Sequence, residues 1–474
     1  MTYAFTFDAS ACSGCKACQA ACKDKNNLPV GVLWRRVYEV TGGDWQRKGE
    51  AWTNTVFAYN LSLACNHCVH PKCAGVCPTD AYVVRPDGIV YIDESKCMGC
   101  GYCAWACPYA VPQYDPDLGQ MTKCNFCFDN IDAGLLPACV AACPLRVLDF
   151  IVVDDGQQAV GGKRLLWSVP ASEHPFPLPN YSRTEPHLAI EPHAGMLNTL
   201  EKVVSNWEEI RPAKPKSELP LVAFTLLIQM AVGAFWSMQW LIGPLWRPVE
   251  HNFTLLRLLP SLLAGACLGV GMLAAFTHLG RKRNAILVLR NLKKSWLSRE
   301  LLWAGLFGTG WAVWFILQVA GIESLLITLF VDLLGLGLIH AMSQVYRLRS
   351  VPAWNTWRTE VGFMVSSLLL GQLIMSCILA IDAYLAGSQL SFGQWQFIGW
   401  STLTLLAMQL VISNWSTSHP TAGRLRLGLS LMGMIGTASF LIPELVPLWT
   451  SPLAFGIVLA EEALGRWLFY EMRP

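Results

Sequence analysis

The first fifteen residues, MTYAFTFDASACSGC, contain no lysine, no arginine and no apolar run of signal-peptide length. The only paired arginines in the N-terminal half, Arg35 and Arg36, have no such run behind them either. Secretory signals combine a basic start with an apolar stretch, so we expect the N-terminal part to carry no export signal of its own. Cysteine-rich segments in a reducing compartment hold metals rather than disulfides.

Charge and cysteine are both scarce in the second half of the chain. Residues 219–474 contain only two of the 18 cysteines, Cys267 and Cys377. They carry 16 lysines and arginines against 10 acidic residues, whereas residues 1–218 carry 19 against 23. The average of 53% hydrophobic residues therefore describes neither part, and we expect two physically different regions.

The other sixteen cysteines repeat one motif four times. The first and third groups have the C-x2-C-x2-C-x3-C spacing of bacterial ferredoxins, and the second and fourth insert extra residues before the third cysteine. Proline follows the last cysteine in three of the four groups. The groups are Cys12, Cys15, Cys18 and Cys22; Cys65, Cys68, Cys73 and Cys77; Cys97, Cys100, Cys103 and Cys107; and Cys124, Cys127, Cys139 and Cys143.

This spacing is typical of [4Fe–4S] clusters. A tight turn lets three thiolates bind three irons of one cluster, while the fourth cysteine, which we expect at the start of a short helix, ligates a neighbouring cluster. Structural zinc uses C-x2-C pairs but not three cysteines within seven residues. The sequence therefore predicts four [4Fe–4S] clusters.

Residues 1–195 resemble the four-cluster ferredoxin subunits of the dimethyl sulfoxide reductase family of molybdenum oxidoreductases, through PVGVLWRRVYEV, LACNHCVHPKCAGVCPTDAY, DGIVYIDESKCMGCGYCAWACPY and KCNFC. The resemblance implies that the first group faces the molybdenum subunit and the third lies nearest the membrane. It also implies four ligand sets: Cys12/Cys15/Cys18/Cys143, Cys124/Cys127/Cys139/Cys22, Cys65/Cys68/Cys73/Cys107 and Cys97/Cys100/Cys103/Cys77.

Residues 151–218 lose the motif and gain proline. Dense proline without a hydrophobic period is typical of an extended strap. Near its end, GMLNTLEKVVSNWEEI suggests a short amphipathic helix. We thus expect a ferredoxin-type domain at 1–150, a strap at 151–218 and a membrane anchor at 219–474.

Apolar runs of membrane-spanning length recur from Leu219 onward. We predict eight transmembrane helices, so that the fold class is an α+β ferredoxin-like domain followed by an all-α polytopic bundle. They are expected at 219–243, 258–279, 301–320, 324–345, 361–381, 395–414, 425–442 and 452–468, the last two being interrupted by Pro443, Glu461, Glu462 and Arg466.

The flanking charges predict the orientation. With eight spans, seventeen lysines and arginines fall on the side of the strap and the C-terminus, and two, Arg247 and Arg257, on the other. Basic residues mark the cytoplasmic side. We therefore expect the ferredoxin domain on the cytoplasmic face of a bacterial inner membrane.

The second half resembles the eight-helix anchor subunit of the same family, through THLGRKRNA, SWLSRELL, VYRLRSVPAWNTWRTEVGF and EEALGRWLFYE. Anchor and ferredoxin are separate chains in the usual arrangement but are fused here. His278 and Glu300 match the anchor family's quinone-site histidine and glutamate, and ionisable groups at membrane depth are functional candidates by default. The alternative is that both are ordinary interfacial caps.

For other ionisable residues of the anchor, structural roles compete with functional ones. His340 adds to the quinone pocket or hydrogen-bonds between helices, and Asp332 is the main acid at mid-bilayer depth. Glu462 and Arg466 stand four residues apart on a helix, which predicts a structural ion pair. No haem is expected, because the anchors that this region resembles carry none.

Together these features predict an electron-transfer and membrane-anchor subunit that connects the membrane quinone pool to a separate, large molybdopterin subunit, where substrate catalysis takes place. It would serve an anaerobic respiratory reductase. The alternatives are the same relay run in reverse, in a cytoplasm-facing sulfite dehydrogenase that reduces quinone, and a redox-driven ion-pumping module. Lipid and quinone are the other expected partners, and no nucleic acid is expected.

Overall fold

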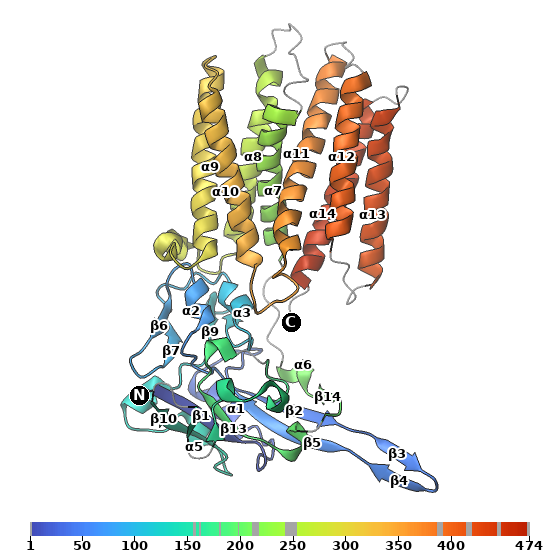
Figure 1. Ribbon diagram of the computed structural model, residues 1–474. Helices are drawn as coiled ribbons and strands as arrows, with labels where there is room; N and C mark the ends of the chain where they lie inside the picture. Colours follow the sequence, from blue (N-terminus) through green and yellow to red (C-terminus); the bar gives the residue numbers. More distant parts are fainter. Residues whose placement is uncertain are drawn as a thin grey trace. The chain divides into compact units, whose positions relative to one another are not determined.

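The computed structural model describes residues 2–154, 158–160, 163–179, 182–197, 199–210, 218–241, 254–385, 392–413, 420–442 and 447–471. The chain forms two compact units. The first comprises Met1–Pro215 together with Leu279–Ser295, and the second comprises Lys216–His278 and Trp296–Pro474. The loop at 279–295 thus belongs to the first unit, although it joins two helices of the second (Figure 1).

Two three-stranded sheets frame the first unit. In one, β1 (Thr2–Asp8) lies between β10 (Leu148–Val153), which is antiparallel to it, and β13 (Leu188–Glu191), which is parallel. In the other, β2 (Arg36–Gly42) pairs antiparallel with β5 (Phe57–Leu63) and β14 (Lys202–Val204). Alternate residues such as Phe5 and Phe7 are buried in a core that also contains Cys65, Cys124, Cys139 and Cys143.

Two-stranded hairpins complete the β structure of this unit. They are β3 (Trp45–Lys48) with β4 (Ala51–Asn54), β6 (Tyr82–Val84) with β7 (Val90–Ile92), β8 (Gln113–Asp115) with β9 (Gln120–Thr122), and β11 (Ala159–Val160) with β12 (Lys163–Arg164). All four residues of β3 and of β4 are exposed. That hairpin therefore contributes nothing to the core.

The cysteine motifs form short helices. They lie on α1 (Ala17–Lys25), α2 (Lys72–Val76), α3 (Tyr102–Ala106) and α5 (Ala138–Ala141), and α4 (Phe128–Asp132) follows Cys127. The prediction that the fourth cysteine begins a helix is wrong. Cys77 and Cys107 end α2 and α3, and Cys22 lies inside α1, because each of these helices begins one residue before the third cysteine of its motif.

Residues 151–210 pair with the two sheets rather than forming only an extended strap. The amphipathic helix predicted at 195–210 does not form over most of its length in the described residues. This stretch instead contains β14, the one-turn helix α6 (Trp207–Ile210) and the end of a short 3-10 turn, η4 (Ala194–Met196). The β-branched Val203 and Val204 suit an added strand better than a helix, and β2 offers the free edge that they extend.

The second unit consists of helices. Its described residues contain eight helices of 18 residues or more, and α7 continues into a π-helical turn, η5 (Ser237–Leu241). The eight are α7 (Leu219–Trp236), α8 (Thr254–His278), α9 (Trp296–Val319), α10 (Leu325–Tyr346), α11 (Trp357–Leu385), α12 (Phe392–Ile412), α13 (Pro420–Ala438) and α14 (Pro447–Glu471). The predicted fold class is confirmed.

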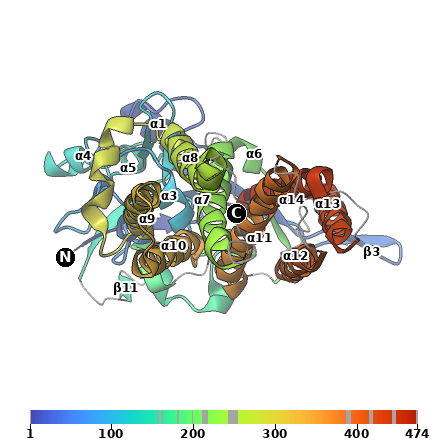
Figure 2. The ribbon, with the colours of Figure 1, turned by 90° about the horizontal axis from the view of Figure 1, so that it is seen from above.

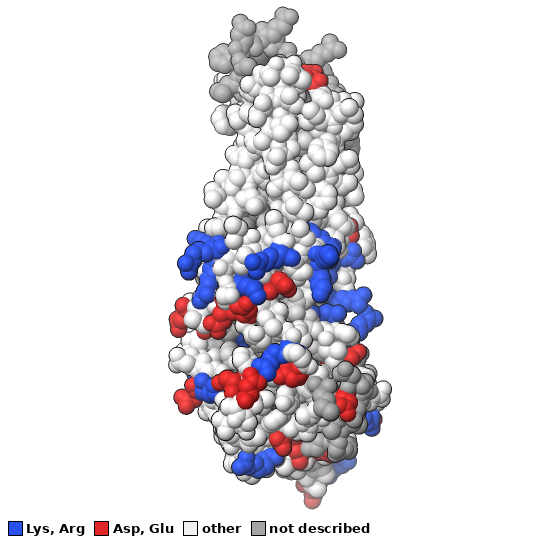
Figure 3. All heavy atoms as spheres, turned by 90° about the vertical axis from the view of Figure 1, so that its left-hand side faces the viewer, with Lys and Arg blue, Asp and Glu red and all other residues white. Residues whose placement is uncertain are grey.

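Six of these helices are long and apolar enough to cross a membrane, namely those from α7 to α12. The chain is therefore a multi-pass membrane protein. Figure 3 shows the long uncharged surface of this unit. Of the eight predicted spans, six are matched by these helices; α13 and α14 are less apolar, because they contain the buried charges Arg426, Glu461, Glu462 and Arg466.

Helix α7 lies at the centre of the second unit. It packs against α8 and α11, with α9 and α10 to one side and α12, α13 and α14 to the other (Figure 2). Glycines allow the closest approach: a Cβ at Gly233 of α7 would lie 1.7 Å from the carbonyl oxygen of Ser367, on α11. Small residues at such crossings are the usual means of packing helices in membranes.

Candidate functional site

The first C-x2-C turn of each motif contains a left-handed residue just before its second cysteine. These residues are Gly14 (φ 69°), His67 (φ 40°), Gly99 (φ 71°) and Phe126 (φ 63°). Such a conformation points successive backbone N–H groups to one side, where they favour negative charge. Accordingly, the amide of His67 lies 3.5 Å from the Cys65 Sγ atom, and that of Phe126 lies 3.4 Å from the Cys124 Sγ atom. The turns are built to hold thiolates.

Two cavities are each lined by four of the sixteen cysteines. One is lined by Cys12, Cys15, Cys18 and Cys143. The other is lined by Cys65, Cys68, Cys73 and Cys107. These are two of the ligand sets that the family resemblance implies, with the fourth thiol of each supplied by a different motif.

The remaining cysteines group in the same manner. The Cys22 thiol lies within electrostatic range of Cys127 and Cys139, and Cys124 within range of Cys22, Cys65 and Cys139. The Cys77 thiol lies within range of those of Cys97, Cys100 and Cys103. The helices pack accordingly, α1 with α5 and α2 with α3.

The residues present fit iron–sulfur clusters. All 18 cysteines are free of disulfides, and nowhere in the described chain do three His, Cys, Asp or Glu side chains converge closely enough for a single metal ion. Burial raises the pKa of the Cys22 thiol to about 12 and that of Cys107 to about 11. Burial therefore disfavours free thiolates at these positions, and metal ligation would stabilise them.

Two buried cations lie beside the thiols, and the sequence reasoning missed both. The Lys123 ammonium group, only 3% exposed, lies 3.5 Å from the Cys65 Sγ atom and donates to the Cys124 carbonyl oxygen at 2.8 Å. The Arg35 guanidinium, 1% exposed, donates to the carbonyl and hydroxyl oxygens of Ser62. The Ser62 hydroxyl is in turn 3.2 Å from the Cys18 Sγ atom. Buried cations offset the negative charge of a thiolate-ligated cluster.

These two residues left weak signals in the sequence. Lys123 directly precedes the fourth motif, and Arg35 stands in the WRRVYEV segment. Lys16, which lies inside the first motif, instead forms surface ion pairs with Glu39 and Glu209, at 2.9 and 2.8 Å. Proximity to a motif in sequence therefore does not distinguish the buried cation from the solvated one.

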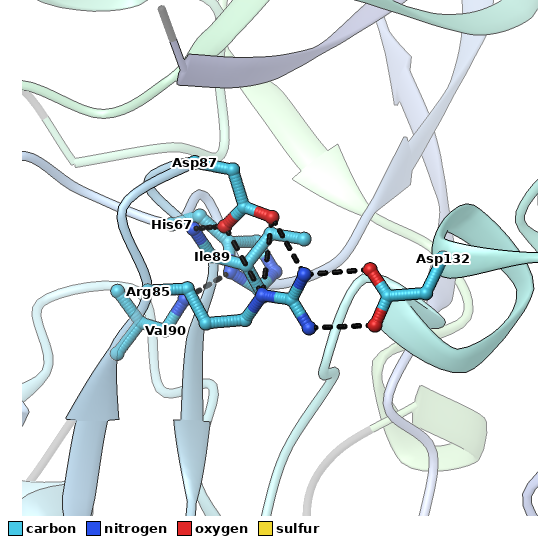
Figure 4. A network of polar contacts seen from close by, with 6 residues as sticks. All are labelled: His67, Arg85, Asp87, Ile89, Val90 and Asp132. Atoms are coloured by element: carbon cyan, nitrogen blue, oxygen red, sulfur yellow. Dashed lines mark hydrogen bonds and ion pairs between the residues drawn. The ribbon is translucent and has the colours of Figure 1, made fainter.

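His67 connects two motifs. Its Nδ1 atom accepts a hydrogen bond from the Val90 amide at 3.0 Å, and its Nε2 atom lies 3.8 Å from the Cys124 Sγ atom. Burial lowers the pKa of this histidine, so that the ring is neutral and carries its proton on Nε2, toward the sulfur. Figure 4 shows how Arg85, which pairs with Asp87 and Asp132, supports the turn that presents Val90.

The loop at 279–295 binds the backbone of the third and second motifs within the first unit. Asn284 donates to the carbonyl oxygen of Cys97 at 2.9 Å, and Asn291 to that of Cys77 at 2.8 Å. The Ser295 hydroxyl donates to the Val76 carbonyl oxygen at 2.7 Å, and the Arg281 amide to that of Met98 at 3.0 Å. Four polar residues of this loop therefore hold the segments that carry one ligand set.

The two predicted quinone-site residues lie at neighbouring ends of consecutive helices in the second unit. His278 is the last residue of α8 and Glu300 is near the start of α9. Both side chains are buried, Glu300 to 1% exposure. Within the described chain the Glu300 Oε1 atom has no hydrogen-bond partner. An unpaired buried carboxyl oxygen is costly and points to a ligand or water at this position.

The other membrane ionisables have partners on neighbouring helices. His340 of α10 lies 2.8 Å from the Glu360 Oε1 atom of α11, which supports the interhelical interpretation. The Trp240 indole donates to the Asp332 carboxylate at 2.7 Å. The ion pair predicted for Glu462 and Arg466 is wrong: Glu462 accepts from Ser366, Arg466 donates to Gln229, and the ion pair joins Arg426 to Glu461 at 2.7 Å. Hydrogen bonds to residues on other helices thus replace the ion pair expected from the i, i+4 spacing.

A cysteine-rich unit built for several metal clusters, attached to a multi-pass helical unit, defines a membrane-anchored iron–sulfur protein. Comparisons with known proteins agree. Residues 56–153 match the family model described as a 4Fe-4S dicluster domain, and residues 214–419 match that of the DMSO reductase anchor subunit.

Relatives of the first unit belong to reductase complexes. The B subunit of the anaerobic dimethyl sulfoxide reductase of Escherichia coli is 45% identical over 192 residues, which cover 40% of this chain and 89% of the relative. The probable anaerobic dimethyl sulfoxide reductase subunit YnfG of the same organism is 43% identical, with 44% and 98% covered. The thiosulfate reductase electron transfer subunit PhsB of Salmonella typhi is 39% identical, with 34% and 83% covered.

The chain therefore belongs to the dimethyl sulfoxide reductase family, and it joins in one polypeptide the regions that correspond to the iron–sulfur subunit and the anchor subunit. Its relatives are subunits of reductase complexes, so the chain is an oxidoreductase subunit that transfers electrons at a membrane.

Proposed function

We propose that this chain carries electrons between the membrane quinone pool and a separate molybdopterin catalytic subunit. The observation that carries the proposal is that the sixteen cysteines of the four motifs lie within one unit, where two cavities are each lined by four of them from two different motifs. The membership of the chain in a reductase family supports the catalytic partner. Substrate chemistry takes place on that partner.

Each of the four sets holds one [4Fe–4S] cluster: Cys12/Cys15/Cys18/Cys143, Cys124/Cys127/Cys139/Cys22, Cys65/Cys68/Cys73/Cys107 and Cys97/Cys100/Cys103/Cys77. When bound, such a cluster accepts and passes on one electron at a time. The cysteine thiolates fix its position, and the backbone amides of the left-handed turns, together with Lys123 and Arg35, set the local charge. These groups are this chain's means of setting redox potentials.

The set of Cys97, Cys100, Cys103 and Cys77 is the one nearest the membrane in this proposal. The loop at 279–295 supports that order, since it hydrogen-bonds the carbonyl oxygens of Cys77 and Cys97 and is continuous in sequence with α8 and α9. The set with Cys12 and Cys15, at the other end of the relay, would face the catalytic partner.

His278 and Glu300 form the quinone site. A quinol that gives two electrons to the relay must also lose two protons. The His278 imidazole is suited to accept a proton from a quinol hydroxyl, and the Glu300 carboxylate to accept one and pass it on. The buried Glu300 Oε1 atom without a hydrogen-bond partner supports an occupant at this position.

The direction of flow selects between two enzymes. If quinol is oxidised, the complex is a respiratory reductase for a sulfoxide, an N-oxide or a similar acceptor, as the names of the relatives suggest. If quinone is reduced, it is a cytoplasm-facing sulfite dehydrogenase. The charge bias of the loops supports a cytoplasmic position of the ferredoxin domain at the bacterial inner membrane, which suits either direction.

Gentle purification from native membranes tests the proposal. We expect a large subunit that contains molybdenum to accompany the chain, with about sixteen irons per chain for four clusters. Assaying that complex with sulfoxides and with sulfite then settles the direction. An iron-loaded chain without a molybdenum-containing partner would contradict the proposed function.

A further inference from the structure

Three ionisable side chains lie one turn apart on a single face of α14. They are Glu462, Arg466 and Tyr470, at the i, i+4 and i+8 positions that align along a helix, and all are buried. Burying charged and polar groups in a membrane bundle is expensive. The proposed function uses none of the three.

One end of this row opens into a polar cavity between α11, α12, α13 and α14. Its lining includes Glu462, Arg466, Ser366 and Gln409, and the exposed side chain of Arg358 connects it to the surface of the unit. The cavity offers about 80 Å³ to the centres of water-sized molecules. By the same measure one water molecule needs about 10–15 Å³, so several fit.

The cavity is lined by both donor and acceptor atoms that lack hydrogen-bond partners among the described residues, which favours water over an ion of one sign as its occupant. In the described structure the Gln409 Oε1 and Arg466 Nε atoms of this lining are buried without a hydrogen-bond partner. One is an acceptor and the other a donor, a mixture that water satisfies and an anion does not. The Glu462 carboxylate, held by the Ser366 hydroxyl at 3.0 Å, is the acid of this hydrated space.

The other end of the row reaches toward the proposed quinone site. The Tyr470 hydroxyl hydrogen-bonds the Tyr346 hydroxyl, at the end of α10, at 2.6 Å. The Tyr346 hydroxyl in turn lies within electrostatic range of the Glu300 carboxyl. Tyr346 and Tyr470 are each no more than 3% exposed. The row thus reaches from the cavity across α14 to the end of α10, within electrostatic range of the α9 acid.

We propose that Tyr346, Tyr470, Arg466 and Glu462 form a lateral route for protons between Glu300 and the hydrated cavity at the α11–α14 surface. This deepens the proposed function and rests on it.

The protons and electrons balance as in quinol oxidation. Each quinol breaks two O–H bonds, sends two electrons to the iron–sulfur relay and releases two protons. One of these protons moves to the His278 imidazole and the other to the Glu300 carboxylate. The second passes along the tyrosine hydroxyls to Glu462, and the positive charge of Arg466 favours its release from Glu462 to the cavity water. When quinone is reduced, the same groups carry protons inward.

A purely structural role for the row is the competing explanation. The nearby ion pair of Arg426 and Glu461, also buried, already ties α13 to α14 and does not need the Glu462 carboxylate. The two adjacent acids thus provide a matched comparison. Glu461→Gln would break the tether and leave Arg426 uncompensated, whereas Glu462→Gln would alter the acid that lines the cavity.

The experiment uses the complete complex in lipid nanodiscs, with menadiol as the electron donor. The rate of cluster reduction is followed by stopped-flow absorbance for Glu462→Gln and Tyr470→Phe. The controls are Glu461→Gln and Tyr384→Phe, the latter an exposed tyrosine near the opposite end of α11. Dithionite, which reduces clusters without a quinol, checks that the relay is intact.

We expect Glu462→Gln and Tyr470→Phe to slow menadiol-driven reduction by about tenfold or more, a low value for the loss of a proton-transfer group, with a larger solvent isotope effect in D2O. Dithionite-driven reduction should not change. Glu461→Gln should lower the melting temperature without slowing the menadiol reaction.

Unchanged menadiol rates in both route variants, or a loss that follows melting temperature equally in Glu461→Gln and Glu462→Gln, would overturn the route. Two further variants, His278→Gln and Glu300→Gln, distinguish failure of the proton route from failure of the proposed quinone site. If the quinone-site variants slow the menadiol reaction and the route variants do not, only the route is contradicted. If the quinone-site variants also react at the normal rate, the proposed quinone site is contradicted as well.

Discussion

The Asn291 side chain donates a hydrogen bond to the carbonyl oxygen of Cys77 at 2.8 Å, although 214 residues separate the two. Asn291 follows the second long helix of the anchor region, and Cys77 ends the second cysteine motif. The amide is buried, so this bond is shielded from water. It makes the loop at 279–295 part of the iron–sulfur unit.

Replacing Asn291 with leucine should weaken that attachment. The Cys77 carbonyl oxygen would lose its partner, which costs about 1–3 kcal/mol for a buried polar group. We expect a lower melting temperature and slower quinol-driven reduction of the cluster held by Cys97, Cys100, Cys103 and Cys77. Asn54→Leu, on the exposed strand β4, is the control and should leave both unchanged.

Gly280→Ala tests the fit of the same loop by steric means. A Cβ at Gly280 would lie 2.0 Å from the Gly119 carbonyl oxygen, a backbone atom that cannot move aside cheaply. The loop should shift, with a measurable loss of thermal stability and broadened electron paramagnetic resonance signals. Gly269→Ala on α8, where a Cβ meets nothing within 4 Å, should behave like the unmodified chain. Equal behaviour of the two variants would show that the loop does not hold this position.

Lys123→Met should make one cluster harder to reduce. Its buried ammonium group lies 3.5 Å from the Cys65 Sγ atom, where positive charge favours the added electron. We expect the potential of the Cys65/Cys68/Cys73/Cys107 cluster to fall by roughly 60 mV, a tenfold change in the one-electron equilibrium. Redox titration followed by paramagnetic resonance measures this, and Lys48→Met on the exposed strand β3 is the control.

Cys77→Ser tests the exchange of fourth ligands between motifs. If Cys77 belongs to the set of Cys97, Cys100 and Cys103, its loss should remove or alter that cluster and leave the cluster of its own motif intact. Iron content should then fall from about sixteen toward twelve per chain, as one of four cubane clusters is lost. Loss of the signal from the Cys65/Cys68/Cys73 cluster would instead assign Cys77 to its own motif.

The sequence predicts those features that local spacing dictates. The left-handed position before the second cysteine of each motif follows from the C-x2-C turn, and glycine occupies it in two motifs, at Gly14 and Gly99. Six apolar helices follow from run length alone. His67 and Phe126 occupy the same strained position without glycine, where packing overrides propensity.

Features that depend on distant partners could not be predicted. Nothing in GRKRNAILVLRN shows that Asn284 and Asn291 bind cysteine carbonyl oxygens some two hundred residues earlier. The i, i+4 spacing of Glu462 and Arg466 suggested an ion pair, yet Ser366 and Gln229 from other helices bind them instead. Such choices are decided by tertiary packing, which a single sequence does not display.

The most direct test of electron transfer through this chain follows the clusters of the purified complex by paramagnetic resonance. Menadiol is added first and an acceptor such as dimethyl sulfoxide second, for the unmodified chain and for Glu300→Gln. We predict that menadiol generates the signals of reduced clusters in the unmodified chain, that the acceptor abolishes them, and that Glu300→Gln slows their appearance strongly. Clusters that dithionite reduces but menadiol never does would contradict the claim that this chain connects quinone to a catalytic partner.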